Sequence, residues 1–255
     1  GDIGDNSGFR DVLGAPPLVH RIAEPDPAGG DQSVAHVDTM RLRYPDGVAH
    51  NAEALVSDGQ GGIFVLTKDD GDLFHLFGAA FQPGDVPVEM VDHGEFDIAP
   101  WLGGAASKVT GADFDSARNR LLVRHWLGIL EYVLPAGRDL ASLQGVDPLV
   151  VPAAAEEQGE AVAYGEGGYY QVSEGAGSPA LARATKRSIS AARISSMNSS
   201  SCCSTRRSTT SACTASTAAP SSTSAAASRK RRLVLAVAIS GEAVAQPVDV
   251  LDRIR

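Results

Sequence analysis

Short apolar runs alternate with Gly, Asp, Pro and Asn along the first 183 residues of the sequence. This pattern is typical of β-strands joined by turns. Helical periodicity is nearly absent, and residues 138–143 are the one segment that we expect to form a helical turn. The expected strands are 17–23, 36–44, 53–57, 62–67, 72–77, 86–92, 109–114, 120–125, 128–133, 147–151, 160–164, 168–173 and 180–183.

The strand-and-turn pattern contains an internal repeat. Segment 51–68 reads as an acidic residue, a strand, a Gly turn and a second strand that ends in a polar residue. Segment 158–175 repeats this order with one deletion, and segment 110–124 is a weaker third copy. Such a repeat must be identified before any fold is assigned, because each unit leaves a face that only its neighbours can bury.

The length of the repeat predicts the fold. The alignment gives Glu53, Asp113 and Glu160 equivalent positions, 60 and 47 residues apart. Four-stranded blades of β-propellers run to roughly 40 to 50 residues plus loop insertions. We therefore expect residues 1–183 to be all-β, a partial β-propeller of about three to four blades, in which residues 1–6 end a strand pair one blade earlier.

The remainder of the chain has a different composition. Residues 1–175 hold 28 Asp and Glu against 10 Lys and Arg, whereas residues 176–255 hold 3 against 12. We expect the Ser-, Ala-, Thr- and Arg-rich segment 184–232 to be disordered, and 233–255 to be a short segment of unassigned structure. A genuine low-complexity tail and a shifted reading frame after about residue 183 both explain the change.

Charge and hydropathy bear on two classes of partner. The acidic first part argues against nucleic acid, because phosphate binding needs clustered Lys and Arg. The longest apolar run, 233–239, is far shorter than the roughly 18 residues that a membrane span requires. We expect no nucleic-acid partner and no transmembrane span.

Several short motifs carry a resemblance to a known group. They are Gly-Asp-Ile-Gly-Asp-Asn at 1–6, Tyr-Pro-Asp-Gly at 44–47, Glu-Ala-Leu at 53–55 with Thr67-Lys68, Val-Thr-Gly-Ala-Asp at 109–113, and Gln-Gly-Glu-Ala-Val-Ala at 158–163 with Ser-Glu-Gly at 173–175. With these motifs, residues 1–183 resemble bacterial, mostly uncharacterised β-propellers of the NHL/WD40-like kind. They are also similar to the esterase-like domains of the phytase group, which implies a cell-envelope or secreted setting.

The repeat also supplies candidate ligand-binding residues. If the equivalent corners of the blades face a central channel, the carboxylates of Glu53, Asp113 and Glu160 converge there. Converging carboxylates favour a compensating cation, which can be Ca²⁺, a cationic ligand, Lys68 or Arg124. The alternative is that each acid accepts backbone N–H groups and fixes a turn. Glu174 in the Ser-Glu-Gly motif completes the candidate set.

A second oxygen-rich segment lies at Asp2, Asp5 and Asn6, and it is a candidate calcium site. Hydrogen bonding within an Asx turn is the alternative explanation for these residues. Calcium is the one cofactor that the sequence indicates. We assign no catalytic residue, because Ser173 does not lie in a Gly-x-Ser-x-Gly elbow.

Three hypotheses for function remain. The first is a non-catalytic propeller scaffold that binds a small molecule or a protein. The second is a calcium-dependent hydrolase of phosphate or carboxylic esters, which the phytase resemblance allows, with Glu53, Glu160 and Glu174 as ligands or base. The third is a truncated or frame-shifted product without function.

Overall fold

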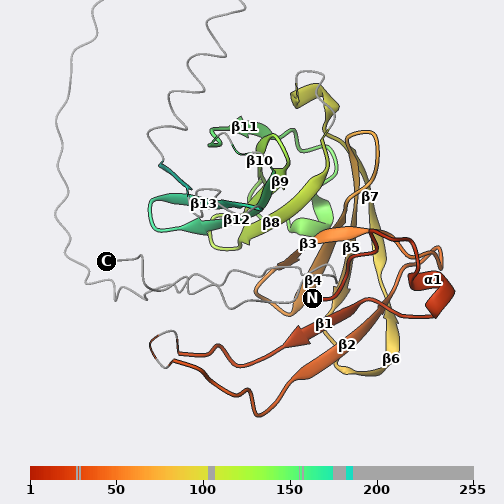
Figure 1. Cartoon of the computed structure of the whole chain (residues 1–255). Helices are drawn as coiled ribbons and strands as arrows, with labels where there is room; N and C mark the ends of the chain where they lie inside the picture. The colour runs from red at the N-terminus through yellow and green to blue at the C-terminus, as the bar shows by residue number, and fades with distance from the viewer. Residues whose placement is uncertain are drawn as a thin grey trace, which may run out of the picture.

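Four β-sheets make up the computed structural model, which describes residues 1–26, 28, 30–102, 107–154, 156 and 158–174, and the backbone of 182–185 (Figure 1). Sheet A holds β1 (Leu18–Arg21), β2 (Asp38–Arg43) and β6 (Gly84–Glu89). Sheet B holds β3 (Ala52–Ser57), β4 (Gly62–Thr67), β5 (Leu73–Ala80) and β7 (Val91–Asp97). Sheet C holds β8 (Val109–Asp115), β9 (Arg120–His125), β10 (Gly128–Val133) and β11 (Leu149–Val151). Sheet D holds β12 (Gly159–Gly165), β13 (Gly168–Ser173) and β14 (Ala182–Thr185).

Sheets B, C and D have the strand order of propeller blades. Each is an antiparallel meander whose first strand lies at one edge of the sheet. These first strands pack side by side, β3 against β8 and β8 against β12. The expected all-β fold, a partial β-propeller, is confirmed, and β3, β8 and β12 are its inner strands.

Sheets B and C bury both of their faces against neighbouring sheets, which explains why their strands read as continuous apolar runs. In β4, Ile63 and Val65 pack with sheet A, whereas Phe64 and Leu66 pack with sheet C. Along β9, the side chain of Leu122 belongs to the cluster shared with sheet D. Each fully buried aliphatic or aromatic side chain contributes roughly 1.5 to 3 kcal/mol to the free energy of folding.

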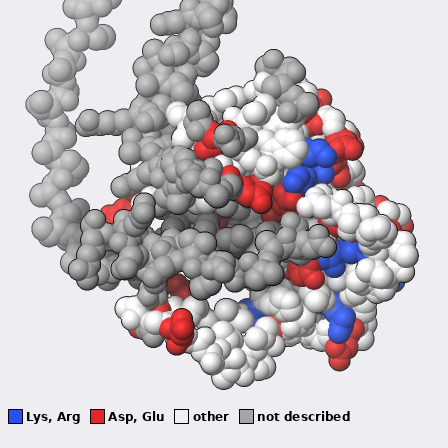
Figure 2. Space-filling model, in the orientation of Figure 1, with Lys and Arg blue, Asp and Glu red and all other residues white. Residues whose placement is uncertain are grey.

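The face of sheet A that is turned away from sheet B is polar instead. Met40 and Leu42 of β2 are buried against sheet B, so the alternate residues Arg41 and Arg43 lie on the opposite face. Arg43 pairs with Glu89 at 2.5 Å, and both side chains are more than half exposed. Figure 2 shows the same pairing of opposite charges on its visible face, where Lys and Arg side chains lie beside Asp and Glu.

One prediction about the strands is wrong. The run 86–92 was expected to form one strand, but it contributes to two strands that belong to different sheets. β6 pairs in parallel with β2 of sheet A, and β7 pairs with β5 of sheet B. Met90 lies between them, is 2% exposed, and donates its N–H to the Arg43 carbonyl. Pro87 fits β6 because an edge strand tolerates a missing N–H.

The other elements are short. The turn expected at 138–143 is confirmed as the 3-10 helix η2 (Leu140–Ser142). The helix α1 (Arg10–Leu13) and the 3-10 helix η1 (Ala99–Trp101) were not predicted, because one turn shows no periodicity in the sequence. Among the described residues, no helix has the length and apolar character needed to cross a bilayer.

The predictions for the C-terminal part lie almost entirely outside the described residues. β14 ends at Thr185, two residues beyond the expected end of the propeller at 183. The remainder of the segment 184–232 and the segment 233–255 are not described, so their expected disorder and the two explanations for their composition stay predictions.

Candidate functional site

Each inner strand carries a β-bulge near its first residue, and the bulges define equivalent positions in the three blades. The pairing register slips at Glu53 in β3, at Thr110 in β8 and at Glu160 in β12. A bulge re-aims the side chain of the extra residue. The sequence alignment that gave Asp113 this position is therefore wrong by three residues, because the structural equivalent is Thr110.

Asp113 lies farther along β8, where it joins two blades. Its Oδ2 accepts the backbone N–H of Tyr164 at 2.6 Å. Burial raises the pKa of the Asp113 carboxyl, and the backbone hydrogen bonds from Tyr164 and Phe114 oppose that rise. Thr110 makes a similar link at the bulge, since its hydroxyl donates to the Gly159 carbonyl at 2.6 Å. Both residues hold β8 against β12.

Glu53 and Lys68 form an ion pair at the bulge of β3. Lys68 Nζ lies 2.6 Å from Glu53 Oε1, and the two side chains are 9% and 10% exposed. The ammonium also lies 5.5 Å from the centre of the Trp126 ring, within the range of a cation–π interaction. On the other side, Asn6 Nδ2 lies 3.5 Å from the same Glu53 oxygen.

Two polar atoms beside this ion pair are left unsatisfied. Glu53 Oε2 and Trp126 Nε1 are buried, and neither has a hydrogen-bond partner within the described part of the chain. An acceptor or donor left in this state costs about 1 to 3 kcal/mol, and more for a charged group. The site therefore holds one unmet acceptor and one unmet donor.

Two further carboxylates come from sheet D. Sheets B, C and D are the blades of the partial propeller and are called blades B, C and D below. Gln158 Nε2 donates to Glu160 Oε1 at 2.6 Å and to Glu174 Oε2 at 2.8 Å. Burial raises the pKa of the Glu160 carboxyl, and repulsion from Glu53 and Glu174 adds to this effect, against the Gln158 hydrogen bond and the attraction of Lys68. Glu160 thus interacts electrostatically with Glu53 and Lys68 of sheet B and with Arg124 of sheet C. We call Glu53, Lys68, Trp126, Gln158, Glu160 and Glu174 the mouth cluster.

The structure therefore brings four of the six expected ligand-binding residues together. These are Glu53, Lys68, Glu160 and Glu174. The sequence analysis missed Trp126 and Gln158. A signal for Trp126 was present, because the expected strands 62–67, 120–125 and 168–173 end directly before Lys68, Trp126 and Glu174.

Arg124 was expected to line the channel, but its side chain is buried between blades C and D. Its guanidinium pairs with Glu156 at 2.6 Å, and the side chains are 1% and 0% exposed. A second donor, Nη1, reaches the Gly128 carbonyl at 3.2 Å. The guanidinium lies against Gly159 so closely that a Cβ at that position would overlap it. Arg124 therefore compensates Glu156 first, and it also interacts electrostatically with Glu160.

The predicted calcium ligands have other partners. Asp2 forms an ion pair with Arg10. Asp5 Oδ1 accepts the backbone N–H groups of Phe9 at 3.0 Å and Arg10 at 3.3 Å, as an Asx turn does. Asn6 accepts a hydrogen bond of 2.7 Å from Asn51. Within the described ranges, no group of three or more His, Cys, Asp and Glu side chains has the arrangement of a metal site, and the calcium site stays a prediction.

A buried Ser-His pair lies near the mouth cluster but serves packing. Ser107 Oγ lies 2.9 Å from His125 Nδ1, and the two residues are 3% and 4% exposed. Burial lowers the pKa of His125 to about 4, and the positive charge of Arg124 adds to this effect. The N–H of Ser107 donates to Asp72, which comes from blade B. The pair thus fastens blade B to blade C.

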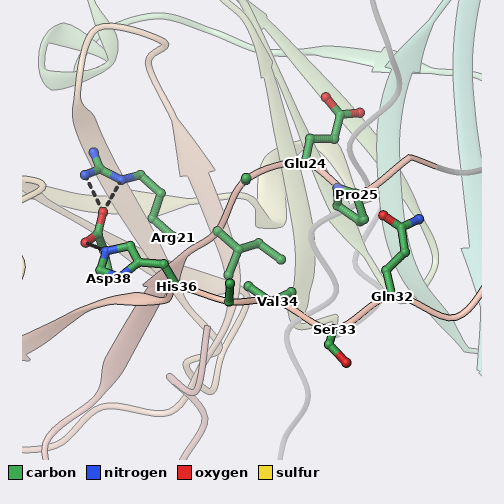
Figure 3. Close-up of a pocket in the computed structure, with 11 residues that line it drawn as sticks. Arg21, Glu24, Pro25, Gln32, Ser33, Val34, His36 and Asp38 are labelled. Carbon is green, nitrogen blue, oxygen red and sulfur yellow. Dashed lines mark hydrogen bonds and ion pairs between the residues drawn. The ribbon is translucent and has the colours of Figure 1, made fainter. Parts of the chain in front are cut away.

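A surface cavity of about 520 Å³ lies in the long loop between β1 and β2. Figure 3 shows the Arg21 guanidinium and the His36 ring directed at the Asp38 carboxylate, with distances of 2.6 and 2.8 Å. The hydrogen bond from Arg21, followed by that from His36, holds the pKa of Asp38 below its usual range. Because Arg21, His36 and Asp38 satisfy one another, this cavity is a weaker candidate than the mouth cluster.

No family model and no curated protein matches the sequence. The PQQ-bound aldose sugar dehydrogenase of Streptomyces coelicolor is 12% identical with a TM-score of 0.35, over 58% of this chain and 50% of that one. A 6-phosphogluconolactonase candidate from Bacteroides uniformis is 11% identical with a TM-score of 0.31, over 67% of this chain and 69% of that one. This chain thus matches half the length of the dehydrogenase, and neither similarity transfers an activity to it.

Proposed function

We propose that this chain is a non-catalytic β-propeller that binds a small molecule at the mouth cluster, in keeping with its resemblance to bacterial propellers of the NHL/WD40-like kind. The observation that carries the proposal is the unpartnered, buried Oε2 of Glu53. A ligand that donates a hydrogen bond to this oxygen removes the cost of leaving it unsatisfied.

The position of the cluster supports this reading. Its side chains come from the ends of strands in three blades, so packed sheets rather than a free loop fix their places. A binding site needs only such fixed polar groups within an otherwise rigid scaffold.

The hydroxyl groups of Ser173 and Ser107 have structural partners. Ser173 Oγ donates to the Gln158 carbonyl at 2.6 Å. Ser107 Oγ is buried against His125. Both hydroxyls hold chain segments together in this arrangement, which favours binding over nucleophilic chemistry.

A ligand screen tests the proposal. We would mix the full chain with small cationic, neutral and anionic probes and detect binding by ligand-observed NMR. Probes that bind wild type should lose binding in Glu53→Gln and keep it in Glu89→Gln, a matched control in the exposed pair with Arg43. If every hit binds Glu53→Gln as well as wild type, the mouth cluster is not the site.

Melting curves show whether each variant is folded, so that a loss of binding is not mistaken for a loss of structure. If Glu53→Gln does not melt cooperatively, Trp126→Phe replaces it, because this change removes only the indole N–H and part of the ring. An arm with millimolar CaCl₂ and chromogenic phosphate and carboxylic esters tests the hydrolase alternative. Calcium-dependent turnover that Glu160→Gln abolishes would overturn the non-catalytic proposal.

A further inference from the structure

The helical turn α1 has the reverse of the polarity expected for a surface helix. Phe9, Val12 and Leu13 lie at positions i, i+3 and i+4, and the Leu13 N–H donates to the Phe9 carbonyl at 2.9 Å, so the three side chains share one face. Their exposed fractions are 58%, 78% and 75%. A surface helix normally turns such a face toward the core, whereas Figure 1 shows α1 at the periphery of the molecule. We call Phe9, Val12 and Leu13 the α1 patch.

The charged residues of α1 hold the turn against the rest of the protein. Arg10 forms an ion pair with Asp2, and its Nε donates to the Gly4 carbonyl at 2.6 Å. The two carboxylate oxygens of Asp11 lie 3.0 and 3.2 Å from the backbone nitrogen of Ala49 and accept its N–H. The α1 patch therefore cannot turn toward the core unless these contacts break. An apolar face held in water in this way is typical of an interaction surface.

Negative charge predominates around the α1 patch. The segments that hold it, 1–16 and 44–50, contain one arginine, Arg10, and no lysine. Their carboxylates are those of Asp2, Asp5, Asp11 and Asp46. Burial raises the pKa of the Tyr44 hydroxyl in the second segment against the opposing charge of Arg10, and the carboxylates of Asp69, Asp46 and Asp5 add to the rise. Three carboxylates thus act on this hydroxyl against one guanidinium.

We infer that the α1 patch docks a protein partner that presents an apolar surface flanked by Lys and Arg side chains. The apolar contact removes the α1 patch from water, which is favourable in proportion to the area covered. The flanking cations complement the carboxylates around the patch, and such complementarity orients the partner and speeds its approach. This surface is distinct from the mouth cluster, so the inference goes beyond the proposed function and does not depend on it.

Two other occupants fit the charge of this surface less well. A second copy of the chain would bring the same carboxylates against those of the first, and like charges that face each other across an interface are unfavourable. A lipid surface with anionic headgroups attracts basic segments and repels acidic ones. A basic protein surface suits both the apolar side chains and the carboxylates.

Three labelled synthetic peptides of equal length test the inference by separating apolar contact from charge. The first is an amphipathic helix of Leu and Lys, the second has Glu in place of Lys, and the third has Gln in place of Leu. Fluorescence anisotropy measures their binding to the full chain at about 150 mM NaCl, where long-range attraction is screened. We expect the Leu/Lys peptide to bind at least tenfold more tightly than either of the others.

Matched variants locate the binding surface. The double variant Val12→Ser, Leu13→Ser should weaken binding of the Leu/Lys peptide at least tenfold. The double variant Val86→Ser, Val91→Ser should leave it unchanged, because these valines are 81% and 59% exposed on β6 and β7. All four substitutions are at exposed positions, and melting curves confirm that both variants fold.

A second pair of variants tests the charge. Asp46→Asn should weaken binding of the Leu/Lys peptide at least twofold, because it removes one of the carboxylates near α1. Asp85→Asn is the control, since it removes the same charge from a side chain that is 99% exposed on β6. Equal effects of the two changes would show that the peptide responds to net charge alone, which would contradict a basic partner at the α1 patch.

Four further results would overturn the inference. The first two are the absence of Leu/Lys peptide binding up to about 1 mM and equal binding of the Leu/Glu peptide. The third is undiminished binding by the Val12→Ser, Leu13→Ser variant. The fourth is that the same variant abolishes binding to phosphatidylcholine vesicles or abolishes a dimer seen by sedimentation, while the peptide does not bind. That result would assign the α1 patch to a lipid surface or to a second copy of the chain.

Discussion

Lys68 and Glu53 form an ion pair of 2.6 Å in which both side chains are about nine-tenths buried, where the inner strand β3 begins and β4 ends. A pair withdrawn from water in this way is costly to break, because the remaining charge cannot regain its hydration. The pair also leaves Glu53 Oε2 without a partner in the described part of the chain. The ion pair therefore stabilises the fold, while the Glu53 carboxylate still has one oxygen that accepts no hydrogen bond in that part of the chain.

Lys68→Met should destabilise the protein by about 3 kcal/mol, because it leaves the Glu53 carboxylate buried without a cation. Urea unfolding measures the change. Arg43→Met is the control, since its pair with Glu89 is more than half exposed and should contribute less than about 1 kcal/mol. Equal destabilisation by the two changes would show that Lys68 and Glu53 are hydrated in solution.

The sequence predicts most strands well because blade packing leaves a strong signal. Strands buried on both faces have unbroken apolar runs, and Gly turns separate them. For β4, β9, β10 and β13 the expected bounds agree with the observed ones. The break at Met90 was missed because the residues on its two sides have a similar composition. They differ only in the strand with which they pair, β2 for β6 and β5 for β7.

The candidate site was predicted only in part, because the sequence does not show the register in which neighbouring strands pair. A bulge shifts pairing by one residue and leaves no trace in composition, so Asp113 was aligned with Glu53 where Thr110 belongs. Arg124 lies on β9 within an apolar run, and only the sheet packing shows that it is directed into the interface with blade D.

Gly159→Ala tests the packing of that interface. A Cβ at this position would overlap the Arg124 guanidinium, which cannot move without separating from Glu156. We expect a loss of roughly 2 to 3 kcal/mol in the free energy of unfolding. Gly8→Ala is the comparison, because Gly8 has a φ of +68° and open space around it, so that only backbone strain of about 1 kcal/mol arises. Similar losses for both would mean that Arg124 adjusts freely.

Stability should fall as the pH drops from 6.5 toward 4, because His125 is buried in its neutral form. Burial lowers its pKa in the folded protein to about 4 from an ordinary value near 6.5. Between these values the unfolded chain binds the proton and the folded chain does not, so acid favours unfolding. The full effect, reached below pH 4, is on the order of 3 kcal/mol.

The midpoint of urea unfolding, measured from pH 4.5 to 7.5, checks this prediction. His125→Gln should remove the His125 contribution, so the difference between wild type and variant isolates it from Asp113 and Glu160. Those two carboxyls have raised pKa values and act in the opposite direction. A difference that does not change with pH would show that His125 titrates normally in the folded protein.

Glu160→Gln should stabilise the ligand-free protein at pH 7 while it weakens ligand binding. The pKa of Glu160 is raised in the folded state, first by burial and then by repulsion from Glu53 and Glu174, so its charged form destabilises the fold. A neutral amide of similar shape removes this cost, as is common for residues kept for function at the expense of stability. The advantage should disappear below about pH 4, where Glu160 is protonated in the folded and unfolded chains alike.

Thermal melts of wild type and Glu160→Gln at pH 7.5 and pH 3.8 measure this difference. Glu89→Gln should show no comparable gain at either pH, because its carboxylate is exposed and paired with Arg43. A higher melting temperature together with loss of ligand binding in Glu160→Gln would assign the carboxylate to recognition. A lower melting temperature at pH 7.5 would instead show that Glu160 holds blade D in place through Gln158.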